Sequence, residues 1–156
     1  MRRILYSGSG DRPRRETTSE VPAPAGMVPR TGGFLTRSID PAALPPWLTD
    51  ADIDFYAQEF TRTGFRGGLN WYRNIKRSWE LLAPWRGRAI HQPSMFIAGA
   101  RDDVLKFPGS KSQIDNFGRT LPGLRGCHVL EGAGHWIQRE RAPAVNGLLI
   151  DFLRQL

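Results

Sequence analysis

The sequence predicts an α/β fold with a parallel sheet in its second half. Residues 93–99 form a short continuous apolar run, which is typical of a strand buried on both faces. Residues 126–130 form a second short strand pattern, and a helical pattern over residues 110–121 separates the two. A final helix with an apolar stripe is expected over residues 143–156. The order of strand, helix, strand and helix is that of an α/β sheet.

The first half predicts helices after a long irregular connection. Residues 1–10 are compatible with the end of a helix, whereas residues 11–46 carry many prolines and glycines without periodicity and predict a long loop. Thr49 is a candidate N-cap for a helix over about residues 50–63. A second helix is expected over residues 68–82, because apolar side chains recur there at helical spacing.

Composition excludes several classes of protein. The chain has 156 residues, 40% of them hydrophobic, which suits one domain or a piece of a larger one. No run of about 18 apolar residues exists, and no apolar segment follows the N-terminus, so neither a membrane span nor a secretory signal is predicted. The single cysteine, Cys127, excludes an internal disulfide and fits a reducing compartment, so we expect a cytoplasmic protein. Because Cys127 lies in the middle of a predicted strand, we expect a buried, inert thiol.

The net charge of +7 does not by itself indicate a nucleic-acid partner. The basic residues are scattered, and their densest cluster, residues 12–15, lies in a Pro-rich loop without a groove-reading motif. We therefore expect a solvated surface and no nucleic-acid binding. His91 and His128 lack metal-ligand spacing with each other or with Cys127, so no metal and no cofactor are expected.

Polar residues follow both predicted strands. The first strand leads into Asp102 and Asp103, and the second leads into a glycine-rich turn before His135. Because functional residues of open α/β sheets gather beyond the carboxyl ends of the strands, parallel pairing would bring these residues to one edge. A carboxylate there can accept the imidazole N–H, fix its tautomer and stabilise the imidazolium. The sequence therefore predicts a histidine base oriented by one of two adjacent aspartates.

Three stretches of the sequence carry a family resemblance. Residues 64–81 read GFRGGLNWYRNIKRSWEL, residues 93–109 read PSMFIAGARDDVLKFPG, and residues 132–153 read GAGHWIQRERAPAVNGLLIDFL. They resemble the C-terminal half of an α/β-hydrolase-fold epoxide hydrolase of the soluble epoxide hydrolase type. The resemblance implies a partial α/β-hydrolase fold. Residues 1–82 would be the later part of a helical cap, and residues 89–156 the last two strands and helices of the parallel sheet.

The resemblance also implies a reaction. In the family, an aspartate opens the epoxide to form an alkyl-enzyme ester, and a histidine backed by an acid activates the water that hydrolyses it. By motif, His135 matches the base and Asp102 the acid, with Asp103 as runner-up, while Tyr72 matches a cap tyrosine that donates to the epoxide oxygen. A phenol of pKa about 10 stays protonated at neutral pH and can donate to a forming alkoxide. The expected partner is a small-molecule epoxide.

Part of the family's machinery is missing from the sequence. No G-x-S-x-G or equivalent Asp elbow precedes Asp102, and no His-Gly-x-Pro oxyanion loop is present. We therefore expect a truncated or incomplete enzyme that is inactive as this isolated chain. Its unpaired sheet edge would pair with the missing N-terminal half or with a second copy. Two alternatives remain: a fragment of a haloalkane or haloacid dehalogenase-like hydrolase, and a non-catalytic remnant that pairs with another chain.

Overall fold

The computed structural model describes residues 1–13 and 31–156. Its helices are α1 (Arg2–Gly8), α2 (Asp50–Thr63), α3 (Arg66–Arg73), α4 (Ile75–Leu81), α5 (Ser110–Asp115), α6 (Phe117–Thr120), α7 (Ile137–Glu140) and α8 (Ala142–Leu153). Short 3-10 turns lie at η1 (Phe34–Arg37), η2 (Ala83–Trp85) and η3 (Asp103–Lys106), and the strands are β1 (Ser94–Gly99) and β2 (Leu124–Leu130). The predicted α/β order of strand, helix, strand and helix is confirmed. Among the described helices, none is both long and apolar enough to cross a membrane.

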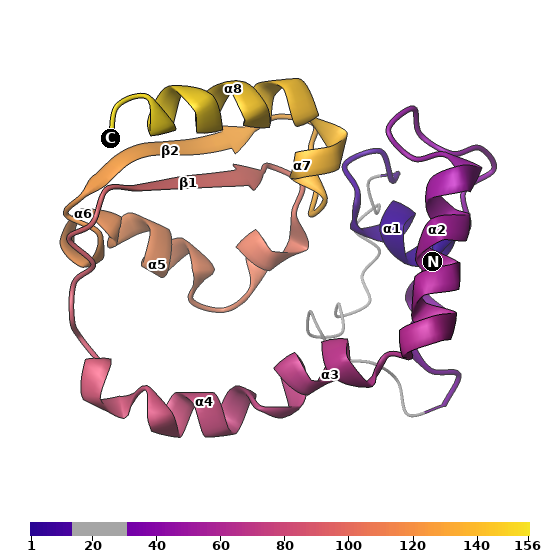
Figure 1. Cartoon of the computed structure of the whole chain (residues 1–156), viewed down its shortest axis with the longest axis horizontal. Coiled ribbons are helices and arrows are strands. Elements are labelled where there is room, and N and C mark those ends of the chain that lie inside the picture. Colours follow the sequence, from indigo (N-terminus) through magenta and orange to yellow (C-terminus); the bar gives the residue numbers. More distant parts are fainter. Residues whose placement is uncertain (14–30) are drawn as a thin grey trace, which may run out of the picture.

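The sheet is parallel and has helices on both sides. β1 pairs with β2, with Gly99 opposite Leu130 at the carboxyl end of the pair. Figure 1 shows α8 on one side of the sheet and α5 and α6 on the other. The rings of Phe96 in β1 and Phe117 in α6 meet edge to face, with centroids 5.1 Å apart. Both strands end next to α7 and the N-terminal segment (Figure 1), so this edge collects the loops that carry the predicted site.

The start of α2 follows from a capping box. The Thr49 side chain accepts from the backbone N–H of Asp52 at 3.1 Å, and the Thr49 N–H donates to the Asp52 carboxylate at 2.9 Å. Two amide groups of the first turn are thereby satisfied. The helix ends at Gly64, whose φ of 68° lies in the left-handed region that favours glycine. The helix expected over 50–63 is confirmed.

Two expected helices are each divided by an asparagine. The helix expected over 68–82 is split into α3 and α4 at Asn74, and the one expected over 110–121 into α5 and α6 at Asn116. In both cases the side-chain amide donates to the carbonyl four residues earlier, at 2.9 Å for Asn74 and 2.7 Å for Asn116. The same carbonyls also accept from the backbone N–H groups of Asn74 and Asn116, at 3.1 Å and 3.2 Å, so each break falls at a residue that is a weak helix former and bonds locally through its side chain. Apolar periodicity does not reveal these breaks.

The loop and the C-terminal helix differ from expectation in detail. Residues 14–30, which belong to the loop expected over residues 11–46, lie outside the described residues. The described remainder of that loop is irregular apart from η1. The final helix runs over Ala142–Leu153, and the short helix α7 before it was not expected.

Burial of the strands is less complete than the sequence suggests. In β1 only Ala98 and Gly99 are buried, and in β2 half-buried and exposed residues alternate. Cys127 belongs to the exposed set, so the expectation of a buried thiol is wrong. Arg125, Cys127 and Val129 are the exposed residues of β2, so this face of the strand stays open to solvent although helices lie on both sides of the sheet.

The surface of α3 and α4 is unusually apolar. Trp71 is 83% exposed, and other large apolar side chains on or beside these helices are also exposed, namely Phe65, Leu69, Ile75, Trp79, Leu81, Leu82 and Trp85. Large exposed apolar side chains that gather on two successive helices mark a candidate site of contact with another surface.

Candidate active site

Asp102 and His135 meet at the carboxyl ends of the two parallel strands. β1 ends at Gly99 and β2 at Leu130, and the loops that follow them carry the two side chains. The Nδ1 atom of His135 lies 3.0 Å from Oδ2 of Asp102. Parallel pairing has therefore brought together two residues that are 33 positions apart in the chain.

The geometry of the pair defines the histidine tautomer. A carboxylate can only accept, so Nδ1 of His135 donates, and in the neutral imidazole Nε2 then keeps its lone pair. The other oxygen of Asp102, Oδ1, accepts from the backbone N–H of Val104 at 2.9 Å, which fixes the plane of the carboxylate. The Asp102 side chain is 16% exposed and that of His135 is 48% exposed. An imidazole held in this way can take a proton from a water molecule at Nε2.

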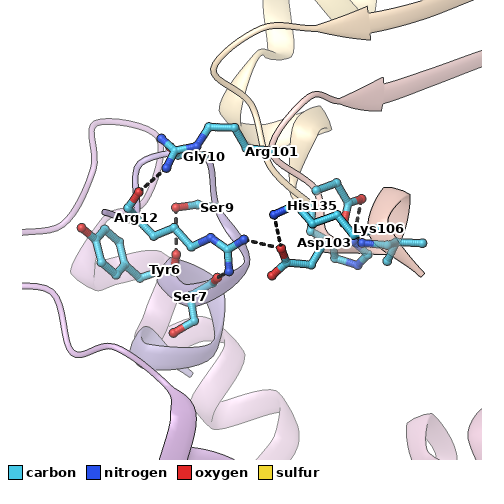
Figure 2. Close-up of polar contacts among 11 residues, drawn as sticks. Tyr6, Ser7, Ser9, Gly10, Arg12, Arg101, Asp103, Lys106 and His135 are labelled. Carbon is cyan, nitrogen blue, oxygen red and sulfur yellow. Dashed lines mark hydrogen bonds and ion pairs between the residues drawn. The ribbon is translucent and has the colours of Figure 1, made fainter. Parts of the chain in front are cut away.

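Asp103 points to other partners. Its Oδ1 lies 2.6 Å from the guanidinium of Arg12 and 3.0 Å from Nζ of Lys106. Figure 2 shows Arg12 reaching across from the N-terminal segment to this carboxylate. The hydrogen bond from Arg12, with a smaller contribution from Lys106, lowers the pKa of Asp103 to about 2. Of the two adjacent aspartates, Asp102 contacts the histidine and Asp103 forms ion pairs.

Replacing Arg12 by glutamine is expected to raise the pKa of Asp103 from about 2 toward its ordinary value of 3.8. Because the folded pKa is depressed, the ion pair stabilises the fold above pH 3.8, and this stabilisation is lost as the pH falls toward 2. The effect on stability is small, because the Asp103 side chain is 47% exposed and solvent screens the pair. A carboxyl-carbon NMR titration measures the shift. Lys106→Gln is the control with a smaller expected rise, and an unchanged pKa in Arg12→Gln would contradict the assignment.

The glycines before His135 allow a close approach of two backbones. Gly132 has a φ of 70°, a left-handed conformation that favours glycine. A side chain on Gly134 would collide with the backbone of Gly8, and one on Gly10 would collide with the carbonyl of Gly132. The backbone N–H of His135 donates to the carbonyl of Gly8 at 2.7 Å. The glycine-rich turn is therefore required because the N-terminal segment lies directly against it.

The N-terminal segment contacts both loops, which the sequence did not indicate. The Trp136 indole N–H donates to the carbonyl of Leu5 at 2.7 Å. The Arg101 guanidinium donates to the carbonyl of Gly10, and to that of Arg12 at 2.6 Å (Figure 2). The interpretation of residues 12–15 as a solvated cluster is wrong for Arg12, whose side chain is only 21% exposed because it bridges to Asp103. Arg14 and Arg15 lie outside the described residues.

Glu140 is a further polar residue of this region that sequence reasoning missed. It is 7% exposed and accepts hydrogen bonds from three backbone N–H groups around His135. The one available signal was a single acid between Arg139 and Arg141 in a basic stretch. That signal is weak, because an acid beside arginines is usually part of a solvated surface.

Tyr72 is not brought to the His135–Asp102 pair. It lies on α3 and is 73% exposed. Figure 1 shows α3 apart from the edge of the sheet where the two strands end. Its role therefore stays a prediction.

The other residues considered at the sequence level do not gather. His91 is exposed, and His128 is half-buried within β2. Within residues 1–13 and 31–156, no three His, Cys, Asp or Glu side chains are placed to hold a metal ion.

Comparison of the sequence with curated proteins finds epoxide hydrolases. The chain is 44% identical over 130 residues to epoxide hydrolase A of Mycobacterium tuberculosis, which covers 83% of the chain and 39% of that protein. It is 48% identical over 117 residues to epoxide hydrolase 1 of Siraitia grosvenorii, which covers 74% of the chain and 37% of that protein. No protein-family model matches the chain.

Comparison of the structure agrees with that of the sequence. An epoxide hydrolase from an endophytic Streptomyces superposes with a TM-score of 0.76 at 47% identity, over 81% of this chain and 38% of that one. The chain is therefore homologous to a segment of epoxide hydrolases, in sequence and in fold, and spans about two fifths of their length. The predicted resemblance to part of an α/β-hydrolase-fold epoxide hydrolase is confirmed.

Proposed function

We propose that this chain supplies the base and the orienting acid of an epoxide hydrolase, and that the nucleophile comes from residues outside these 156. The observation that carries the proposal is the His135–Asp102 pair, with 3.0 Å between Nδ1 and Oδ2, at the ends of two adjacent parallel strands. Among the reactions that such a pair can serve, epoxide hydrolysis is supported by the similarity of the chain to epoxide hydrolases.

The proposed reaction converts an epoxide and water to a vicinal diol in two steps. A carboxylate nucleophile attacks a ring carbon, the ring C–O bond breaks, and the released oxygen takes a proton from the proposed donor, Tyr72, which leaves an alkyl-enzyme ester and a deprotonated donor. Water then attacks the ester carbonyl while Nε2 of His135 takes its proton and Asp102 stabilises the imidazolium. The acyl C–O bond breaks, the leaving alkoxide takes the proton back from Nε2 of His135 and departs as the diol, and the carboxylic acid left on the enzyme loses its proton, which returns to the donor of the first step through solvent and restores the nucleophilic carboxylate.

The exposed apolar surface supports the idea of a covering segment. The side chains of α3 and α4, together with the uncovered face of β2, are the surfaces that additional chain would bury. The segment that the relatives have and these 156 residues do not is the proposed occupant. A second copy of the chain is the competing occupant. A cytoplasmic location is also part of the proposal and is supported by the single free cysteine.

Complementation tests the proposal. The residues of the Streptomyces epoxide hydrolase that precede its aligned part are fused to the N-terminus of this chain, and diol formation is assayed with aryl and alkyl epoxides. We expect the 156-residue chain alone to form no diol and the fusion to form diol that depends on His135. Turnover of haloalkanes but not of epoxides by the fusion would favour a dehalogenase-like activity. A folded fusion that is inactive toward both would favour a non-catalytic remnant.

Tyr72→Phe in the fusion is expected to slow ester formation by roughly tenfold to a thousandfold, the contribution of a single donor to a developing oxyanion. The change removes one O–H donor and little volume, so hydrolysis of the preformed ester should hardly change. Stopped-flow measurement separates the two steps. Tyr56→Phe, on α2, is the matched control. If Tyr72→Phe lowers only the melting temperature, Tyr72 is a packing residue.

A further inference from the structure

Glu140 is a buried carboxylate to which the proposed mechanism gives no role. Its Oε2 atom accepts from the backbone N–H of Gly134 at 2.8 Å and of Gly10 at 2.7 Å, and its Oε1 atom accepts from that of Trp136 at 2.9 Å. Only 7% of the residue is exposed. A carboxylate is costly to bury unless its oxygens are hydrogen-bonded, and three charge-assisted bonds satisfy this requirement.

Two of these bonds flank the proposed base. The three consecutive amides around it all have partners: Gly134 donates to Glu140, His135 donates to the carbonyl of Gly8 at 2.7 Å, and Trp136 donates to Glu140. The peptide groups on both sides of His135 are therefore held in place. Because these groups set the direction of the Cα–Cβ bond, they also set where the imidazole points.

The third bond connects Glu140 to the loop that carries the acid. Gly10 donates its N–H to Glu140, and its carbonyl accepts from the guanidinium of Arg101. The backbone N–H of Arg101, next to Asp102, also donates to the carbonyl of Ala133 at 2.8 Å. A continuous set of hydrogen bonds thus runs from Glu140 through Gly10 to the residue that precedes the proposed acid.

We propose that Glu140 is a positioning residue for His135. It holds the imidazole in the orientation that pairs with Asp102 and, through Gly10 and Arg101, fixes the separation of the two loops. The catalytic consequence rests on the proposed function, whereas the positioning itself is a property of the folded chain and is measured without turnover.

Glu140→Gln is the informative replacement because it keeps the shape and changes the hydrogen bonding. Three N–H groups converge on the two oxygens of Glu140. Glutamine has one oxygen and one NH₂ group, so at least one N–H would face another donor. Glu131→Gln makes the same atomic exchange at an exposed site four residues before His135 and is the matched control.

The experiment uses NMR on the full chain. The imidazole Nδ1–H resonance of His135 reports the bond to Asp102 and is assigned by its loss in His135→Gln. Glu140→Gln is expected to abolish this resonance. It should also speed amide exchange at Gly134 and Trp136 by roughly tenfold to a hundredfold, which corresponds to the loss of one hydrogen bond to a charged group. Protection of Phe96 in β1 should persist, and Glu131→Gln should change none of these signals. An unchanged Nδ1–H resonance in folded Glu140→Gln would overturn the proposal.

If Glu140→Gln does not fold, a second measurement on the unmodified chain tests the proposed hydrogen bonds to Glu140. In the unmodified chain, couplings across hydrogen bonds should correlate the amide nitrogens of Gly10, Gly134 and Trp136 with the carboxyl carbon of Glu140. Absence of the Gly134 and Trp136 correlations would overturn the proposal.

The fusion protein supplies the catalytic readout. There Glu140→Gln is expected to slow ester hydrolysis by about a hundredfold, the loss that a misplacement of about 1 Å can cause, and to leave ester formation unchanged. Equal slowing of both steps would contradict positioning of the base. If the unmodified fusion forms no diol, the proposed function fails. The NMR measurements on the 156-residue chain still test whether Glu140 positions His135, because they do not depend on turnover.

Discussion

Replacement of His135 by glutamine in the fusion is expected to leave epoxide ring opening intact and to slow ester hydrolysis by about a hundredfold to ten-thousandfold. This is the range that a positioned general base contributes. Glutamine has no group that can take a proton from water at neutral pH, so the alkyl-enzyme ester should accumulate. Mass spectrometry of the intact protein should find a covalent adduct equal in mass to the epoxide.

The control for this experiment is His91→Gln, which makes the same replacement at an exposed histidine. It should turn over at the unmodified rate and show no adduct. Release of diol by His135→Gln at the normal rate would show that His135 is not the base. Loss of both diol and adduct in His135→Gln would show that His135 is needed for ring opening.

Asp102→Asn is expected to slow ester hydrolysis by up to about ten-thousandfold, as happens when the carboxylate of a Ser-His-Asp triad becomes an amide. The asparagine must still face two donors, Nδ1–H of His135 and the N–H of Val104, with a single carbonyl oxygen. One of them would then meet the NH₂ group, which favours the wrong imidazole tautomer and removes the charge that stabilises the imidazolium.

Asp103→Asn is the matched control, because it makes the same change at the adjacent residue. Its partners are Arg12 and Lys106, and an ion pair of this exposure contributes roughly 0–1 kcal/mol. We expect hydrolysis to change by less than about tenfold. Single-turnover rates of ester hydrolysis measure both variants. If Asp103→Asn had the larger effect, the acid would be Asp103.

Several elements could be predicted because their causes are local. The capping box at Thr49 and the left-handed glycine at position 64 fix the ends of α2, and both can be recognised within a few residues of sequence. The two strands follow from apolar runs between turn residues. The breaks at Asn74 and Asn116 were missed because the apolar pattern continues across both residues, whereas asparagine is a weak helix former that bonds locally to the backbone.

The sequence by itself determined that strands alternate with helices in the second half, and that an aspartate pair and a histidine follow two of those strands. Hydrophobic periodicity and the rules of parallel sheets suffice for this, because they act over short stretches of chain. Only the tertiary structure decided that Asp102 contacts His135 and that Asp103 forms an ion pair with Arg12. The tertiary structure also decided that Glu140 and Gly10 hold the loop that carries His135. The residues of these contacts lie far apart in the chain, 33 positions for His135 and Asp102 and 130 for Gly10 and Glu140, and the contacts depend on how backbones and side chains meet in space, which no local pattern of residues specifies.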